Sequence, residues 1–275
     1  MTDQVSKNRS PFLFILMVFL LSTPLYWFND RSVLPKSFHM YAPIFIFAAI
    51  IPVSLANLFL YRERGWNGVR DLWKNVFDFE RIRNKLWYIP IFLLMPATVV
   101  ATYFLMPLIG KTIPDPQFPI LMVPVLFAVF FVLAIGEEAG WSGYVIGGLQ
   151  ERWGALTSSI VLGIAWASWH ILPFIQAHHA SNWWTVWQCL GTVPLRVLMV
   201  WIYHNTGRSI LAMVLFHAMI NESEIMFPNL GSHYDPLIPF VILTVMAAIV
   251  VFLWGGKTLA RYRFAPSNNP TFERS

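Results

Sequence analysis

The chain has 275 residues, of which 57% are hydrophobic and only 12% are charged. Soluble domains carry about a quarter charged residues, because a surface that faces water must be polar. Apolar runs of about 20 residues, the length that an α-helix needs to cross a ~30 Å hydrocarbon core, recur along the chain. The composition therefore excludes a water-soluble protein and predicts an all-α, polytopic membrane helix bundle.

The apolar runs predict about eight transmembrane helices. The first run follows Lys7 and Arg9, as in a signal peptide, but ends without a small-residue cleavage site, so we expect it to be retained as a span. In chain order, the predicted spans cover residues 11–28, 40–61, 86–109, a fourth that begins near 119 and includes 137 and 138, 155–175, 183–203, 209–227 and 237–256.

The distribution of Lys and Arg predicts that both termini are cytoplasmic. In that orientation 15 of the 19 basic residues lie in inner segments and three lie in outer loops, while Arg196 lies within a span. This excess is typical of cytoplasmic loops. Seven of the basic residues lie in the 62–85 connection, where Trp and Phe alternate with them, and which is either an interfacial helix or an ordinary connector.

The remaining sequence predicts one transmembrane domain, residues 1–263, followed by a disordered tail, 264–275. The lone cysteine, Cys189, excludes an internal disulfide and a CxxC metal site. No basic cluster lies beside stacking aromatics in a soluble segment, so we expect the lipid bilayer as a partner and no nucleic acid. The predicted location is an integral, multi-pass membrane protein, in the inner membrane if the source is a bacterium.

Polar and ionisable residues inside the spans mark the candidate site, because such groups are costly in a bilayer and usually functional. The members are Glu137, Glu138, His170, His217 and Asn221.

The spacing of these residues predicts that two of them meet. The chain runs about 15 residues from Glu137 to the polar break at Arg152 and 18 more to His170. Two antiparallel helices hinged near Gly154 would therefore bring the carboxylate and the imidazole to similar heights.

His217 and Asn221 are four residues apart and share one helix face. Together with Glu137 and His170 they can activate a water and hold an oxyanion. Glu137, with His170 beside it, would take a proton from the water, and His217 and Asn221 would donate to the oxygen of a tetrahedral intermediate. The same groups could instead ligate a divalent metal that lowers the pKa of the water. Composition does not choose between these chemistries.

Three motifs in this region resemble the CPBP family of intramembrane proteases, which includes the CAAX prenyl endopeptidases and the bacteriocin-processing, Abi-type proteins. They follow the patterns E-E-x-x-x-(R)-G, aromatic-x-x-x-H and H-x-x-x-N within residues 119–225. In this chain they read EEAGWSG at 137–143, WASWH at 166–170 and HAMIN at 217–221.

The resemblance implies an eight-span fold and an endopeptidase that acts on a membrane-associated peptide or protein. It also implies that Glu137 is the water-activating base with His170 as its partner, and that Glu138 supports them. His217 and Asn221 match the oxyanion pair. The family is usually named as metalloproteases, although a metal-free glutamate mechanism has also been argued for it. If a metal such as zinc is bound, the resemblance implies that Glu137, His170 and His217 hold it.

One position departs from the family pattern, because Ser142 stands where arginine is usual. Serine offers only a hydroxyl, although Arg196 in another span could replace the cation in space. The alternative is therefore a catalytically degenerate membrane binding or immunity protein of the same fold. A third class is a transporter or a haem protein that uses His170 and His217. No inverted repeat favours transport, and a Soret band would reveal haem.

Overall fold

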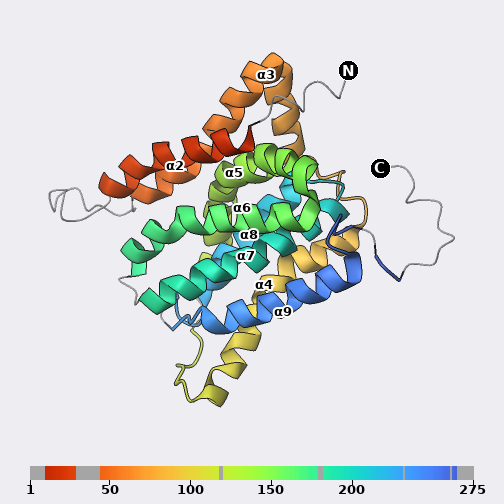
Figure 1. The fold of residues 1–275 in the computed structure, drawn as a ribbon. Helices are drawn as coiled ribbons and strands as arrows, with labels where there is room; N and C mark the ends of the chain where they lie inside the picture. Colours follow the sequence, from red (N-terminus) through yellow and green to blue (C-terminus); the bar gives the residue numbers. More distant parts are fainter. Residues whose placement is uncertain are drawn as a thin grey trace.

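The regular secondary structure of the described chain is all helical, which confirms the predicted all-α fold class. A computed structural model describes residues 10–28, 44–117, 120–178, 182–231, 233–260 and 262–264, and these contain no β-strand. The α-helices, shown in Figure 1, are α2 (Pro11–Phe28), α3 (Ile50–Val76), α4 (Tyr88–Leu105), α5 (Val123–Gly140), α6 (Ile146–His178), α7 (Asn182–Asn205), α8 (Ile210–Met226) and α9 (Leu237–Trp254). Short 3₁₀ segments cover Ile44–Ala49, Lys85–Trp87, Pro107–Ile109 and Ile120–Met122.

Four helical stretches are long and apolar enough to cross a membrane: Lys85–Ile109, Ile120–Ile175, Trp183–Asn205 and Leu237–Trp254. A shorter apolar helix covers Pro11–Tyr26. Each predicted span coincides with one of these helices or with α3 or α8, whereas the number of crossings and their orientation stay predictions. The predicted tail, 264–275, lies outside the described residues except for its first residue.

Helix α3 continues well beyond the predicted span, which ended at residue 61. It reaches Val76 across a break at Gly65, whose φ of 59° and ψ of −155° are not helical. The first part of the basic 62–85 connection is therefore helical, as one of the two interpretations of it expected.

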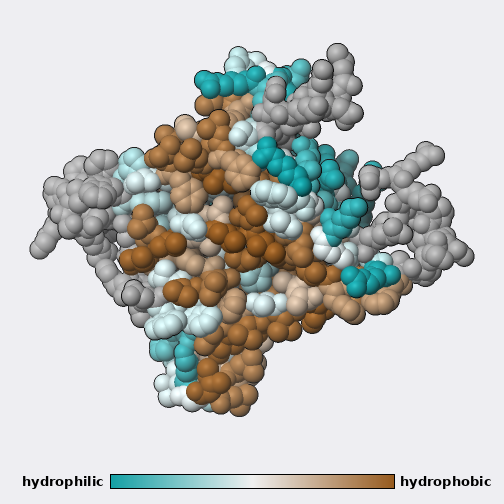
Figure 2. All heavy atoms as spheres, viewed as in Figure 1, coloured by the Kyte–Doolittle hydropathy of each residue, from teal (hydrophilic) through white to brown (hydrophobic). Residues whose placement is uncertain are grey.

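Helix α8 forms the centre of the bundle and contacts α3, α4, α5 and α7 (Figure 1). Its residues from Ile210 to Ala218 are all buried. Large hydrophobic side chains are instead exposed on the outer helices, as in Leu16, Leu93 and Val245. Figure 2 shows brown, hydrophobic atoms over the middle of the visible face, while teal, hydrophilic atoms gather towards its edges. This pattern suits a protein surrounded by hydrocarbon.

Two glycines bring α5 close to α3 and to the 3₁₀ segment that precedes it. A Cβ atom on Gly136 would lie 2.5 Å from the carbonyl oxygen of Ala49, and one on Gly140 would lie 2.6 Å from Cβ of Pro52. Small residues four apart are typical of close contacts between membrane helices. They lie on either side of the glutamate pair and so position it against the bundle interior.

The hinge predicted near Gly154 is confirmed. Gly154 interrupts α6 with φ 75° and ψ −176°, a conformation that favours glycine. The N–H groups of Ala155 and Leu156 donate to the carbonyls of Lys257 (3.0 Å) and Gly256 (2.9 Å) instead of to their own helix. The chain therefore turns at this point, and the second part of α6 packs back along the bundle.

Candidate active site

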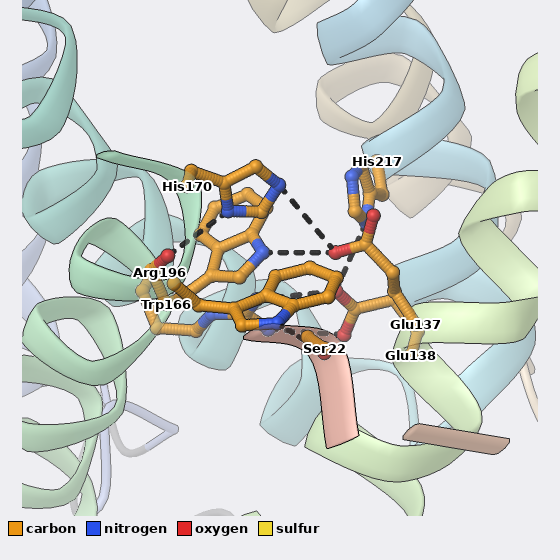
Figure 3. Close-up of polar contacts among 8 residues, drawn as sticks. Ser22, Glu137, Glu138, Trp166, His170, Arg196 and His217 are labelled. Carbon is orange, nitrogen blue, oxygen red and sulfur yellow. Dashed lines mark hydrogen bonds and ion pairs between the residues drawn. The ribbon is translucent and has the colours of Figure 1, made fainter. Parts of the chain in front are cut away.

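Glu137 and His170 meet inside the bundle, as the residue count predicted. The Glu137 side chain is nearly buried, and its Oε2 lies 3.9 Å from His170 Nε2 (Figure 3). The same oxygen accepts a hydrogen bond from Trp166 Nε1 (3.0 Å). His170 Nδ1 lies 2.9 Å from the carbonyl oxygen of Trp166, which can only accept, so this nitrogen carries a proton. In the neutral ring, Nε2 is then an acceptor that faces the carboxylate.

Glu138 lies in a separate, fully enclosed cluster. Arg196 donates to both of its oxygens, from Nη1 to Oε2 at 3.0 Å and from Nη2 to Oε1 at 3.1 Å. Ser142 Oγ also donates to Oε2, and His217 Nδ1 donates to Oε1 at 3.0 Å. Glu138 is 0% exposed and Arg196 is 1% exposed, so neither can touch a substrate directly. The two adjacent glutamates therefore have different environments.

The Glu138 cluster orients His217. Because Nδ1 of His217 donates to the carboxylate, its Nε2 is left for another group. The Trp166 ring packs edge-on against both imidazoles, with ring centroids 5.1 Å from His217 and 5.3 Å from His170. Arg196 lies over the same indole, 4.4 Å from its centroid. Trp166 thus contacts both histidines and Arg196 with one ring.

Asn221 lies one turn beyond His217 on α8 and is partly buried. Both side chains project from the same helix face, as their spacing predicted.

A π-helical turn, Trp141–Val145, follows the glutamate pair directly. Such turns are rare and occur frequently at functional sites. Ser142 lies in this turn, within hydrogen-bonding reach of Glu138.

The side chains of Glu137, His170 and His217 have the donor types that zinc accepts in proteins. Among the described residues, however, no group of three or more His, Cys, Asp or Glu side chains is arranged to hold a metal ion. We therefore derive no step through a metal, and the predicted metal site stays a prediction.

Sequence reasoning missed two contacts: the indole hydrogen bond of Trp166 to Glu137 and the paired Arg196–Glu138 contact. The signal for the second was an arginine within a predicted span, which needs a buried partner. The expectation that Arg196 can replace the family arginine in space agrees with this position.

The buried ionisable cluster within apolar helices defines an integral membrane protein with an enzyme-like site. The family described as type II CAAX prenyl endopeptidase Rce1-like matches residues 119–222. A curated relative, CAAX prenyl protease 2 of Methanococcus maripaludis, is 27% identical over 235 residues, which cover 80% of this chain and 85% of the relative. These matches and the three motifs make the chain similar to CAAX prenyl proteases of the CPBP family, and they support an intramembrane protease as the class of protein.

Proposed function

We propose that the protein is an endopeptidase that hydrolyses a peptide bond of a membrane-associated substrate, with Glu137 as the base that activates water. The observation that carries the proposal is the 3.9 Å approach of Glu137 Oε2 and His170 Nε2, beside an imidazole that is oriented by a second carboxylate. An approach of this length is too long for a direct hydrogen bond and suits a group held between the two side chains.

In the first step, a water between Glu137 and His170 gives a proton to the carboxylate while its oxygen attacks the carbonyl carbon of the scissile bond. The carbonyl π electrons move to oxygen and form an oxyanion. His170 can orient the water because its Nδ1–H is bonded to the Trp166 carbonyl, which leaves Nε2 to accept a hydrogen bond from the second O–H of the water.

In the second step, His217 Nε2–H and the Asn221 carboxamide donate to the oxyanion. Donation from Nε2 requires a doubly protonated His217, because Nδ1 already donates to Glu138. The charges of His217 and Arg196 are then balanced by those of Glu138 and the oxyanion. When the intermediate collapses, the carbon–nitrogen bond breaks and protonated Glu137 gives its proton to the leaving amine. The products are a carboxylic acid, which ionises by losing its proton to solvent, and a neutral amine.

A bound divalent ion such as zinc would lower the pKa of the water and polarise the carbonyl. Glu137, His170 and His217 are the residues that would hold it. Metal content measured on the purified protein, before and after chelation, tests this separately from the roles of the side chains.

Arg196 also bears on the alternative of a degenerate binding or immunity protein. That reading rests on the loss of the family arginine at Ser142. Arg196 brings a cation to Glu138, and Ser142 donates to the same carboxylate oxygen, which supports an intact site over a degenerate one.

The test compares wild type and Glu137→Gln, purified in detergent, on a set of membrane-delivered peptides. A prenylated CAAX peptide is the first probe, because the curated relative is a CAAX prenyl protease, and the same peptide without its lipid is the second. We expect cleavage by wild type and a rate at least ~100-fold lower for Glu137→Gln. The matched control is Glu222→Gln, the same chemical change at a buried carboxylate on a different helix, α8.

Two outcomes would contradict the proposal. One is a Glu137→Gln variant that cleaves as fast as wild type. The other is a folded wild type that cleaves no peptide while Glu137→Gln retains the cellular function, which would favour the degenerate protein.

A further inference from the structure

The mechanism leaves one carboxylate on the active face of α8 without a role. Glu224 follows His217 and Asn221 at intervals of four and three residues, so all three project from the same face. Seven residues of helix correspond to about 10 Å. Glu224 therefore lies about 10 Å from the oxyanion histidine, towards the end of the bundle where α7 begins and α8 ends.

Glu224 has only neutral partners among the described residues. Gln188 Nε2 donates to its Oε2 at 3.0 Å, and the Tyr234 hydroxyl donates to its Oε1 at 3.3 Å. Of the ion pairs found in that part of the chain, none includes Glu224. Glu138, in contrast, is held by the guanidinium of Arg196. A carboxylate in a low-dielectric site is costly without a cation, and one with two neutral donors still has lone pairs to offer.

Helix α7 continues the polar contacts of the active site up to Glu224. Gln188, Thr192 and Arg196 recur at intervals of four residues, so they form one row on α7. Arg196 contacts the Glu138–His217 cluster at one end of this row, and Gln188 contacts Glu224 at the other. The antiparallel helices therefore line a polar strip that begins at the catalytic residues.

The strip ends at an open pocket. Tyr234, which is bonded to Glu224, lines a cavity of about 610 Å³ together with Lys111, Trp184 and Asp235. A series of packed rings connects the pocket with His170, because Trp184 packs edge-on against Phe174 at 5.9 Å and Phe174 stacks on His170 at 5.4 Å.

We propose that Glu224 binds a positively charged substrate side chain, Lys or Arg, about three residues from the scissile bond. The separation follows from the ~10 Å between His217 and Glu224 and from the ~3.3 Å that an extended peptide spans per residue. A charge-assisted hydrogen bond in a site of low dielectric is stronger than a neutral one. This specificity role rests on the proposed endopeptidase function, which delivers the peptide to the site.

The experiment scans a single Lys through positions two to four on each side of the scissile bond of a cleaved peptide, with Gln as the reference residue. In wild type, we expect Lys near the third position on one side to raise kcat/KM about 10- to 100-fold over Gln. Glu224→Gln keeps the size and the hydrogen-bonding atoms of the side chain and should abolish the preference. Glu222→Gln removes a carboxylate two residues away on another face of α8 and should keep it. Glu224→Lys should favour a Glu peptide instead.

Measurements of peptide binding test this proposal independently of the proposed function. The affinities of the Lys and Gln peptides are measured for Glu137→Gln and for Glu137→Gln/Glu224→Gln. This measurement does not depend on cleavage. A preference for the Lys peptide that requires Glu224 supports the binding site even if no variant cleaves. The absence of cleavage would overturn only the proposed endopeptidase function. Equal affinities and a flat cleavage scan would show that Glu224 merely ties α8 to α7 and would overturn the proposal.

Discussion

At the scale of single residues, the central feature is the complete pairing of Glu138. One carboxylate of α5 accepts four hydrogen bonds, two from Arg196 of α7, one from His217 of α8 and one from Ser142. Removing one partner of a buried ion pair costs about 3–5 kcal/mol, because the other charge is left uncompensated. The cluster therefore fixes the relative positions of three helices and, through them, of His217.

Exchanging the two side chains that share Glu138 Oε2 tests this balance. Ser142→Arg should lower the melting temperature, because it buries a second cation beside Arg196. Arg196→Ser should lower it further, because Glu138 loses its only arginine among the described residues. The double exchange, Ser142→Arg with Arg196→Ser, moves the cation to the position that the family pattern favours. We expect it to be more stable than Arg196→Ser alone, with a coupling of about 1–3 kcal/mol.

Thermal unfolding of the four proteins in one detergent measures that coupling. Strictly additive shifts would mean that the guanidinium at residue 142 cannot reach Glu138, and that the two positions are not equivalent.

The same residues show how far sequence reasoning reaches. Glu137 and His170 could be brought together by counting, because one hairpin with a glycine hinge joins them. The partner of Glu138 could not be predicted this way, since Arg196 lies 58 residues away on α7, whose rotation depends on packing. The donor to Glu137 was missed for a similar reason, because the direction of the Trp166 indole is set by its packing between two histidines.

At the scale of elements, the approach of α5 to α3 positions the glutamate pair. Pro52 of α3 lies directly against Gly140, where an added Cβ would be 2.8 Å from the Pro52 carbonyl oxygen. Backbone at that distance cannot move aside without displacing the helix.

Gly140→Ala should therefore destabilise the protein by about 1–3 kcal/mol, as overpacking does in tight interiors. It should also lower peptidase activity, because α5 must shift with Glu137 on it. The matched control is Gly191→Ala in α7, where the new Cβ would meet only Phe240 at 3.9 Å, an ordinary contact. Alanine favours helix over glycine by up to ~1 kcal/mol, so this control should be neutral or stabilising. Equal melting temperatures for the two variants would contradict the close-packing argument.

The positions of the membrane helices were predictable from hydropathy, but the length of α3 and the π turn after α5 were not. The continuation of α3 to Val76 escapes an apolar-run criterion, because its second part is basic and amphipathic. The π turn after Gly140 leaves no trace in hydropathy, since it changes the backbone period and not the composition.

At the scale of the whole molecule, the bundle encloses one polar helix face within an apolar shell. Helix α8 is central, and the outer helices expose large hydrophobic side chains. A protein of this kind needs a defined orientation in the bilayer, because its substrate must reach the site from one side or from within the membrane. The orientation is predicted only by the distribution of Lys and Arg.

Accessibility of single cysteines tests that orientation and whether α4 crosses the membrane. Cys189 is the only cysteine and is half-buried in α7, so Cys189→Ala provides the background. Three exposed positions report on the connections: Glu80 between α3 and α4, Asp115 between α4 and α5, and Thr258 after α9. With 15 basic residues in inner segments and three in outer loops, we expect Asp115→Cys to react with a membrane-impermeant maleimide in intact cells.

Glu80→Cys and Thr258→Cys should react only after the cells are permeabilised, because both then lie on the cytoplasmic side. Labelling of positions 80 and 115 from the same side would mean that α4 does not cross the membrane. A pattern reversed at all three positions would keep the span count and invert the orientation, which would place the α7–α8 strip that ends at Glu224 on the cytoplasmic side. An outcome as predicted places the Glu224 end of the strip towards the outer side, so a substrate with a basic residue would engage it from there.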